Sequence, residues 1–248
     1  MRIAVAGGTG RVGSHVAEIA RERGHDVAVL TRSRGVDLVT GRGLAAALDG
    51  TDAVIDVVSV DTLDAQKSVA FFETTTRALL DAEAAASVGH HVALSIVGID
   101  RAPEGYYAGK LAQERLIENG PVPWTILRAT QFHEFAAQIF ASAKVGPLHV
   151  APRMRTQPIA AREVAARLVA LAEAAPAGRV RDLAGPREES LPDMVRRWAR
   201  AQGSRAWVPA IPLPGALGRA QRDGSLLPGP DAELGIQTFA EWLSGTKL

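Results

Sequence analysis

The sequence predicts an α/β protein with a doubly wound parallel sheet, and three observations support this fold class. Short apolar runs alternate with longer amphipathic stretches up to residue 127, which is typical of parallel strands joined by crossover helices. The apolar runs are rich in Val and Ile and show little alternation, as expected of strands covered on both faces. Apolar residues make up 47% and charged residues 22% of the 248 residues, close to the average of globular domains.

Five apolar runs are predicted to be strands, and three stretches between them are predicted to be helices. The strands are residues 3–6, 26–30, 53–58, 91–95 and 124–127. The first helix carries Val12, Val16 and Ile19 at helical spacing. The second covers about residues 64–84, and the third begins near Tyr106. The predicted buried face of the third helix is Ala108, Leu111, Ala112 and Leu116.

The regular alternation ends after Leu127, where glycine and proline become frequent. We therefore expect one domain over residues 1–248. Its core covers about residues 1–150, and a small C-terminal substrate-binding region covers about residues 151–248.

Two helices are predicted in the C-terminal region. The first covers residues 163–173. The second begins after Ser190, which is expected to cap it together with Asp193. Its apolar face consists of Leu191, Met194, Val195 and Trp198. Three arginines lie on its other side and suit a solvated face better than an anion site: Arg196, Arg197 and Arg200.

Charge and composition exclude several classes of function. The net charge of +1 gives no chain-wide field that would attract nucleic acid or an anionic membrane. The absence of cysteine excludes disulfides, thiolate metal sites and a cysteine nucleophile. No signal peptide and no apolar run of about 18 residues is found, so we expect a cytoplasmic protein that does not bind membranes. No metal is expected either, because His90 and His91 would point to opposite faces of a strand.

A glycine-rich turn joins the first strand to the first helix with the spacing G-x-x-G-x-x-G. Gly7 allows a tight turn, Gly10 lacks a Cβ that would keep a pyrophosphate away, and Gly13 lets the helix pack closely on the strand. Amides at the helix start supply donors and a partial positive charge. Because strand, turn and helix are in register, we favour a nicotinamide dinucleotide site over a turn that binds nothing. The expected contacts are Gly7, Thr9, Gly10, Arg11, Val12 and Gly13.

The end of the second strand predicts which dinucleotide is preferred. An acidic residue there would bind the ribose hydroxyls of NAD. The sequence has Arg32 and Arg34 instead, and a guanidinium pairs with phosphate through two hydrogen bonds. We therefore expect Arg32, assisted by Arg34 or Arg11, to bind the 2′-phosphate, so that NADP(H) is preferred over NAD(H). The alternative is an ordinary surface arginine.

Tyr106 and Lys110 have the spacing Y-x-x-x-K, which places them about 40° apart on one helix face. A tyrosine can protonate a carbonyl oxygen if a nearby cation lowers its pKa from about 10. Lys110 is a candidate for that cation and for a contact with the cofactor ribose. Ser95 is a third catalytic candidate because ligands bind at the carboxyl ends of parallel strands. Tyr107 is also one turn from Lys110, so which tyrosine faces the cleft stays open, and chance spacing is the alternative for the pair.

Several segments resemble NmrA-like NAD(P)-binding proteins of the atypical short-chain dehydrogenase/reductase family. They are GGTGRVG at residues 7–13, YYAGKLAQE at 106–114, WTILR at 124–128, PIA at 158–160 and LAGP at 183–186. The resemblance implies a Rossmann-like doubly wound parallel sheet, a small C-terminal substrate-binding region and bound NADP(H). It also implies that Phe132 lies near the nicotinamide and that His133 meets the substrate. The alternative for Phe132 is a place in an aromatic core, and the alternative for His133 is a loop or cap histidine.

The same resemblance implies several functions. We favour an oxidoreductase that uses NADP(H) to reduce a small carbonyl or quinone substrate. A redox-sensing regulator that binds NADP(H) without turnover, and a relative of the sugar-nucleotide epimerases, are the alternatives, because fold analogy alone does not decide between them.

Overall fold

The computed structural model describes residues 1–145 and 148–245, which form two compact units. The first unit consists of Met1–Ile96, Pro103–Arg128 and Arg162–Arg181. The second unit takes the rest of the described chain. Residues 162–181 thus belong to the first unit, although they follow the expected boundary near residue 150.

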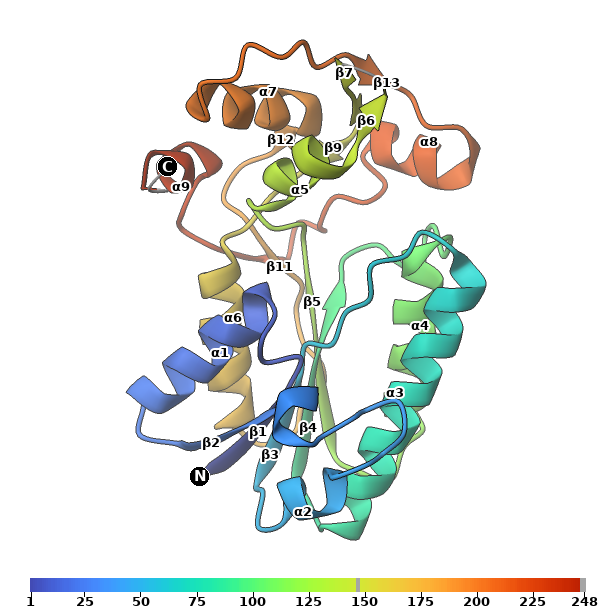
Figure 1. Ribbon diagram of the computed structural model, residues 1–248. Coiled ribbons are helices and arrows are strands. Elements are labelled where there is room, and N and C mark those ends of the chain that lie inside the picture. Colours follow the sequence, from blue (N-terminus) through green and yellow to red (C-terminus); the bar gives the residue numbers. More distant parts are fainter. Residues whose placement is uncertain (146–147, 246–248) are drawn as a thin grey trace. The chain divides into compact units, whose positions relative to one another are not determined.

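A parallel sheet forms the centre of the first unit (Figure 1). Its strands are β1 (Arg2–Ala6), β2 (Asp26–Leu30), β3 (Ala53–Asp56), β4 (His90–Ile96), β5 (Trp124–Ala129) and β10 (Gly178–Arg179). Their order is β5-β4-β3-β1-β2, and β10 pairs with β5. β1 is parallel to both of its neighbours, with Ala6 opposite Leu30 on one side and Asp56 on the other. The carboxyl ends of these three strands therefore meet at one edge of the sheet.

Helices cover both faces of this sheet (Figure 1). α1 (Arg11–Glu22) and α6 (Ala161–Ala172) lie on one face, and α2 (Leu44–Leu48), α3 (Ala65–Ala85) and α4 (Tyr106–Glu118) lie on the other. The central strand β1 has no exposed surface from Ile3 to Ala6. This two-sided cover explains why the strand sequences are continuously apolar. The predicted Rossmann-like, doubly wound α/β fold is confirmed.

The five predicted strands are confirmed, with shifts at their ends. β2 has the predicted bounds, whereas β5 continues two residues further to Ala129. β3 ends at Asp56 rather than at Val58, because the chain turns there and the Asp56 carboxylate accepts a hydrogen bond from the Val58 amide at 2.9 Å.

The buried face of α4 is polar, and the predicted apolar face is wrong. The predicted residues are only half-buried: Ala108, Leu111, Ala112 and Leu116. The residues that are buried are Gly109, Lys110, Gln113, Glu114 and Ile117. Buried partners explain the difference, because Asp56 on β3 and Arg128 on β5 hold the polar side chains of α4. Gly109 also brings α4 close to α3, since a Cβ there would lie 2.2 Å from Ser68 Oγ.

The second unit is built from short elements. Its helices are α5 (Phe135–Ser142), α7 (Leu191–Ala201), α8 (Gly215–Asp223) and α9 (Phe239–Gly245). Its strands are β6 (Lys144–Val145), β7 (Leu148–His149), β8 (Ala151–Pro152), β9 (Arg155–Thr156), β11 (Leu183–Ala184), β12 (Glu189–Ser190), β13 (Ala210–Ile211) and β14 (Glu233–Leu234). Strand β8 pairs with β13, β9 with β12, and β6 with β7. β11 pairs with β14 and with Ala129, the last residue of β5.

Both predicted C-terminal helices are present as α6 and α7. On α7, Leu191, Met194 and Val195 are buried as predicted, and the half-buried Trp198 packs against the same apolar cluster. The predicted cap is wrong: the Ser190 side chain makes no capping hydrogen bond. The Asp193 carboxylate instead accepts a hydrogen bond from Arg196 at 2.7 Å, which leaves the helix start without a side-chain cap.

Two further observations bear on ligand classes. Over residues 1–145 and 148–245, no helix is both long and apolar enough to cross a membrane. In the same residues, no three His, Cys, Asp or Glu side chains gather in a way that could hold a metal ion. His90 and His91 have separate partners, Thr125 for the first and the Glu83 carboxylate for the second.

Candidate functional site

The glycine-rich turn between β1 and α1 is so tight at Gly7 and Gly13 that side chains do not fit at these two positions. Gly7 has a φ of +78°, and a Cβ there would lie 2.7 Å from the Val57 carbonyl oxygen. The Gly10 amide donates to the Gly7 carbonyl at 2.9 Å and closes the turn. A Cβ on Gly13 would lie 2.2 Å from that same Gly7 oxygen. The two outer glycines therefore shape the backbone, while Gly10 is exposed at its surface.

The start of α1 presents backbone amides to this turn. The N-cap is Gly10, which has no side chain to bond the first amides, and the first turn contains no acidic residue. The first amides of a helix have no partner within the helix, and they carry about half a positive charge. The arrangement suits a diphosphate, which would bind to the amides that follow Thr9 and Gly10. Val12 is the first buried apolar side chain of the helix.

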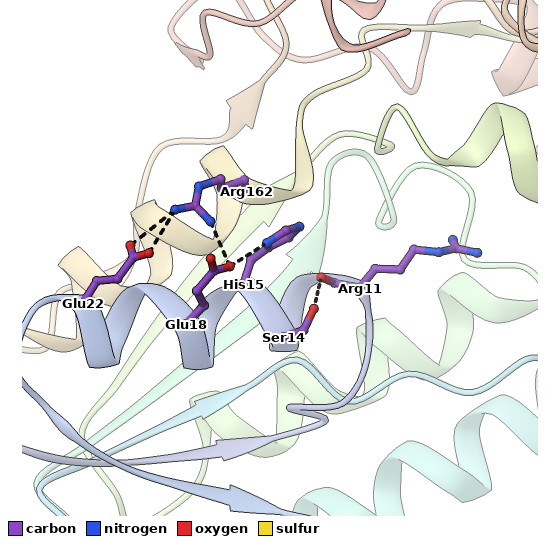
Figure 2. A network of polar contacts seen from close by, with 6 residues as sticks. All are labelled: Arg11, Ser14, His15, Glu18, Glu22 and Arg162. Carbon is purple, nitrogen blue, oxygen red and sulfur yellow. Dashed lines mark hydrogen bonds and ion pairs between the residues drawn. The ribbon is translucent and has the colours of Figure 1, made fainter. Parts of the chain in front are cut away.

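Figure 2 shows the first turns of α1 from close by. The Ser14 hydroxyl donates to the Arg11 carbonyl at 3.0 Å, and the Arg11 side chain extends away from the other labelled residues. Further along the helix, Arg162 of α6 donates to Glu18 at 2.9 Å and pairs with Glu22 at 3.3 Å. These carboxylates thus join α1 to α6. Because all three charged groups are half-exposed, the pairs contribute little to stability.

Arg32 and Arg34 lie directly after β2, in a single 3-10 turn that spans Arg32–Arg34. The register of β1 with β2 sets Ala6 opposite Leu30, so this turn and the glycine-rich turn leave the same edge of the sheet. Both side chains are exposed, and neither has an ion-pair partner among residues 1–145 and 148–245. No carboxylate follows β2 before Asp37. The segment that follows β2 is therefore cationic up to Asp37.

Tyr106 is the first residue of α4, and its hydroxyl meets Ser59 from the loop after β3. The Tyr106 Oη and Ser59 Oγ atoms lie 3.1 Å apart, and the Tyr106 carbonyl accepts a hydrogen bond from Ser68 Oγ at 3.0 Å. The ring is packed edge-on against Phe72, with centroids 5.6 Å apart. Burial raises the pKa of Tyr106, and the nearby Asp56 charge raises it further, against the Ser59 hydrogen bond. The direction is opposite to the lowering expected from a neighbouring cation.

Lys110 points into the protein rather than to its surface. Its side chain is 3% exposed, and its ammonium donates to the Leu94 carbonyl at 2.6 Å and to the Gln113 side-chain oxygen. Gln113 in turn donates to the Asp56 carboxylate at 2.8 Å. Burial lowers the pKa of Lys110 to about 8, against the attraction of Asp56 and Glu114. Lys110 and Tyr106 are thus one turn apart as predicted, but their hydrogen bonds lead to different groups.

Ser95 lies near the carboxyl end of β4 and is 3% exposed. Its hydroxyl has no hydrogen-bond partner in the part of the chain that the structure describes. A buried hydroxyl is normally bonded, so an unsatisfied one at the ligand-binding edge of a parallel sheet is a candidate contact for a ligand.

Three residues of this site were not found from the sequence: Ser59, Asp56 and Gln113. Asp56 carried one usable signal, because it is a carboxylate at the end of an apolar strand, where a charge needs a partner. Ser59 and Gln113 have no distinctive spacing, and only the tertiary structure brings them to Tyr106 and Lys110.

Phe132 and His133 belong to the second unit. Phe132 is half-buried and forms a bridge with Ile159. His133 is fully buried, and its ring lies 5.8 Å from Phe239 and 5.7 Å from Trp242 between centroids. His133 lies in the turn before α5 with its ring among aromatic side chains, which favours the alternative of a loop or cap histidine over a substrate contact.

The fold and the glycine-rich turn define a dinucleotide-binding protein, and comparisons with known proteins agree. A family model described as NAD(P)H-binding matches residues 7–175, beginning at the first glycine of the turn. The chain therefore belongs to this family of NAD(P)H-binding proteins. A comparison with curated proteins gives no match.

Solved structures that match the chain have the same fold. The NADPH-dependent quinone oxidoreductase of Escherichia coli, in complex with NADPH, is 18% identical, with 98% of each chain covered and a TM-score of 0.74. A UDP-glucose 4-epimerase of Stenotrophomonas maltophila with bound NAD is 15% identical over 98% of this chain and 96% of its own, with a TM-score of 0.72. A nucleoside-diphosphate-sugar epimerase of Staphylococcus aureus is 17% identical over 98% and 99%, with a TM-score of 0.71. At these identities the likeness concerns the fold alone.

Proposed function

We propose that this protein is an NADPH-dependent reductase of a small carbonyl or quinone substrate. The observation that carries the proposal is the place of the cationic groups: the start of α1 lies at the same edge as Arg32 and Arg34, and no carboxylate follows β2 before Asp37. The amides of the turn suit the diphosphate, and the guanidinium groups suit the 2′-phosphate that distinguishes NADP(H) from NAD(H).

The residues near Tyr106 support the reduction step. When bound, NADPH supplies the hydride. The Tyr106 hydroxyl, whose raised pKa keeps it protonated at neutral pH, would donate a hydrogen bond and then a proton to the substrate oxygen. Ser59 holds the Tyr106 hydroxyl in place, and the unsatisfied Ser95 hydroxyl offers a second donor.

Lys110 has a positioning role in this proposal. Two of its three ammonium protons are bonded to Leu94 and Gln113, and we assign the third to a cofactor ribose hydroxyl. Its bonds to β4 and, through Gln113, to β3 fix α4 on the sheet and so fix Tyr106 at the start of that helix.

The raised pKa of Tyr106 and the inward direction of Lys110 also favour a second candidate function. A tyrosine without a cation at its hydroxyl is a weak general acid. A regulator that binds NADP(H) without turnover needs the cofactor site but not an activated tyrosine. It must, however, bind NADPH and NADP⁺ with different affinities, because equal affinities shift no equilibrium.

Calorimetric titration with NADPH and NADH tests the cofactor preference. Replacing Arg32 by alanine is expected to weaken NADPH binding about 10- to 100-fold, the value of a charge-assisted phosphate contact, and NADH binding by less than about 3-fold. Arg21→Ala is the matched control, since Arg21 is an exposed arginine in the last turn of α1. Equal weakening of both nucleotides by Arg32→Ala would show that Arg32 does not bind the 2′-phosphate.

Substrate turnover separates the two functions. Oxidation of NADPH is followed as loss of absorbance at 340 nm with a panel of quinones, small aldehydes and ketones. Epimerisation of UDP-sugars consumes no NADPH, so it is followed separately by the appearance of the epimeric sugar. The reductase predicts turnover of a quinone or carbonyl, reduced about 100-fold or more by Tyr106→Phe with NADPH affinity unchanged. No turnover across the panel, together with unequal affinities for NADPH and NADP⁺, would replace the reductase by the regulator.

A further inference from the structure

The second unit contains a pocket whose charged lining consists only of arginines. Its volume is about 310 Å³, and the residues that line it are Arg153, Met154, Arg155, Ser190, Pro192, Arg196, Ala210 and Arg222. This volume lies at the lower end of the range for small-molecule sites. All the lining residues belong to the second unit, so the pocket does not depend on the glycine-rich turn.

Backbone hydrogen bonds hold two of the lining residues, Arg153 and Met154, in place. Arg153 and Met154 connect β8 to β9, and they are held from both sides. The Arg153 amide donates to the Ile211 carbonyl at 2.7 Å, and the Leu191 amide donates to the Met154 carbonyl at 3.0 Å. The two small strand pairs β8–β13 and β9–β12 therefore place Arg153 between them.

Two of the four arginines are already neutralised. Arg155 makes a two-pronged contact with Glu188 at 2.6 and 2.9 Å. Arg196 donates to Asp193 at 2.7 Å and to the Val208 carbonyl at 3.1 Å. These ion pairs hold the Arg155 and Arg196 side chains in place, and they leave little positive charge on either side chain for a ligand.

For the other two arginines, Arg153 and Arg222, the described residues provide no hydrogen-bonded carboxylate. Arg222 donates to the Leu213 carbonyl at 2.7 Å. Its neighbour Asp223 has its carboxylate bonded to Ser225, by the amide at 2.8 Å and by the hydroxyl at 2.5 Å. The Arg153 side chain is exposed, and it has no hydrogen-bond or ion-pair partner within residues 1–145 and 148–245. Arg153 thus lines the pocket without a partner among the described residues, whereas Arg222 is bonded to a carbonyl and interacts electrostatically with Asp223.

The rest of the pocket lining is mainly apolar and would contact an apolar part of a ligand. Met154 and Pro192 are buried, and with Ala210 they give the pocket an apolar wall beside the arginines. Ser190 adds an exposed hydroxyl that makes no capping hydrogen bond. Ligand sites combine mainly apolar walls with a few placed polar groups, and this pocket has that composition.

We propose that this pocket binds a small molecule with an apolar body and an anionic head group, a carboxylate or a phosphate, and that Arg153 holds the head group. A guanidinium without a protein partner supplies donors in the geometry of both anions. The proposal goes beyond cofactor binding and does not depend on the reductase activity, because the pocket and the glycine-rich turn share no residue.

Binding of phenyl phosphate, benzoate and inorganic phosphate tests the proposal. The whole chain is used, with saturating NADP⁺ present so that the probes do not bind in the glycine-rich turn. We expect saturable binding, with one site per chain, of phenyl phosphate or benzoate, at least about 10-fold tighter than inorganic phosphate. Whether phenyl phosphate or benzoate binds better identifies the head group. Equal affinity for inorganic and phenyl phosphate, or a response that does not saturate, would overturn the proposal.

Two arginine variants separate a specific contact from general attraction of anions. Arg153→Ala is expected to weaken binding of the phenyl probe at least about 10-fold, and Arg153→Lys less than that, because lysine keeps the charge without the fork of donors. Arg205→Ala is the control, since Arg205 is an exposed arginine of the same unit outside the pocket lining. Equal effects of Arg153→Ala and Arg205→Ala would contradict the proposal.

A third variant makes failure of this proposal distinguishable from failure of the cofactor proposal. Gly10→Val places a side chain at the exposed surface of the glycine-rich turn, where φ is −77° and the new Cβ meets only the Gly7 oxygen at 3.2 Å. It is expected to abolish NADPH binding and to leave phenyl-probe binding within about 2-fold. If Gly10→Val removed both, the phenyl probe would be binding in the glycine-rich turn and the pocket would not be its site.

Discussion

Helices α4 and α7 are similar in length, yet they bury opposite kinds of surface. α7 buries Leu191, Met194 and Val195, which form an ordinary apolar stripe. α4 buries Lys110, Gln113 and Glu114 in the first unit. The difference lies in what each helix packs against, because α7 faces an apolar cluster and α4 faces Asp56 and Arg128 on the sheet strands.

The difference shows that apolar packing does not explain why α4 buries charged side chains. An apolar stripe stabilises a helix wherever it is covered, whereas a buried ion contributes little net stability unless it is paired and bonded. Glu114 and Lys110 have such partners, and they lie on the helix that begins with Tyr106. The polar face of α4 thus supports the candidate site, and the apolar face of α7 supports only the fold of the second unit.

The largest expected effect follows from removing one charge of the buried pair on α4. Glu114 accepts two hydrogen bonds from Arg128 at 2.8 and 2.7 Å, and both side chains are less than 10% exposed. Glu114→Ala removes the carboxylate that accepts both hydrogen bonds from the buried Arg128 guanidinium, together with its contact to Arg179 at 3.3 Å. We expect a loss of about 3–5 kcal/mol in the free energy of unfolding, measured by urea denaturation.

The double variant Glu114→Met, Arg128→Met is the control for this pair. Since it removes both charges and keeps similar volume, it is expected to recover most of the lost stability. A loss below about 1 kcal/mol for Glu114→Ala would mean that the polar face of α4 is solvated rather than buried.

The second effect is a pH dependence that only the polar face should show. Lys110 has a pKa lowered by burial to about 8, from an ordinary value of 10.5. Between these values the unfolded chain holds a proton that the folded chain has lost, so stability rises with pH. Compared with Lys110→Met, the wild type should therefore gain on the order of 2–3 kcal/mol in unfolding free energy as pH rises from 7.5 to 10.5.

Met194→Ala on α7 is the matched variant for this titration. It removes buried apolar volume and is expected to cost about 2–5 kcal/mol at every pH in the range. If the difference between wild type and Lys110→Met also stays constant with pH, the ammonium of Lys110 is exposed to water in solution.

The smallest expected effect compares two helix starts. Asp64 caps α3, since its carboxylate accepts a hydrogen bond from the Lys67 amide at 3.0 Å, whereas Ser190 makes no such bond at α7. Asp64→Ala should cost about 1 kcal/mol, and Ser190→Ala less than about 0.5 kcal/mol, in thermal unfolding. Equal losses would show that Ser190 does cap α7 in solution.

Most of the first unit could be predicted from the sequence because its rules are local. The strand runs, the glycine spacing and the stop signals each act within a few residues, and the strand β2 was placed with its observed bounds. The face of α4 could not be predicted in this way, because periodicity assumes that the buried side is the apolar one. Here Asp56 and Arg128, which are distant in sequence, make the polar side the buried one.

The part of the candidate site that the backbone forms could be predicted from the sequence, whereas the contacts between its side chains could not. The turn from Gly7 to Gly13 follows from residues that must lack a Cβ, and the structure shows this close approach at Gly7 and at Gly13. The role of Gly10 toward a pyrophosphate stays a prediction. The contact between Tyr106 and Ser59 joins α4 to the loop after β3, and no spacing in the sequence indicates it. For the same reason the spacing of Tyr106 and Lys110 did not reveal that the lysine is directed inward.

The return of residues 162–181 to the first unit has a consequence for synthesis on the ribosome. α6 covers one face of the central sheet, and Ala165, Leu168 and Val169 are fully buried. A nascent chain that has grown only to residue 150 therefore holds all of β1 to β5 but leaves apolar sheet surface in contact with water or chaperones. The first unit cannot bury this face of its sheet before about seven tenths of the polypeptide has been made. A shortened gene that ends at residue 150 would therefore encode an aggregation-prone product.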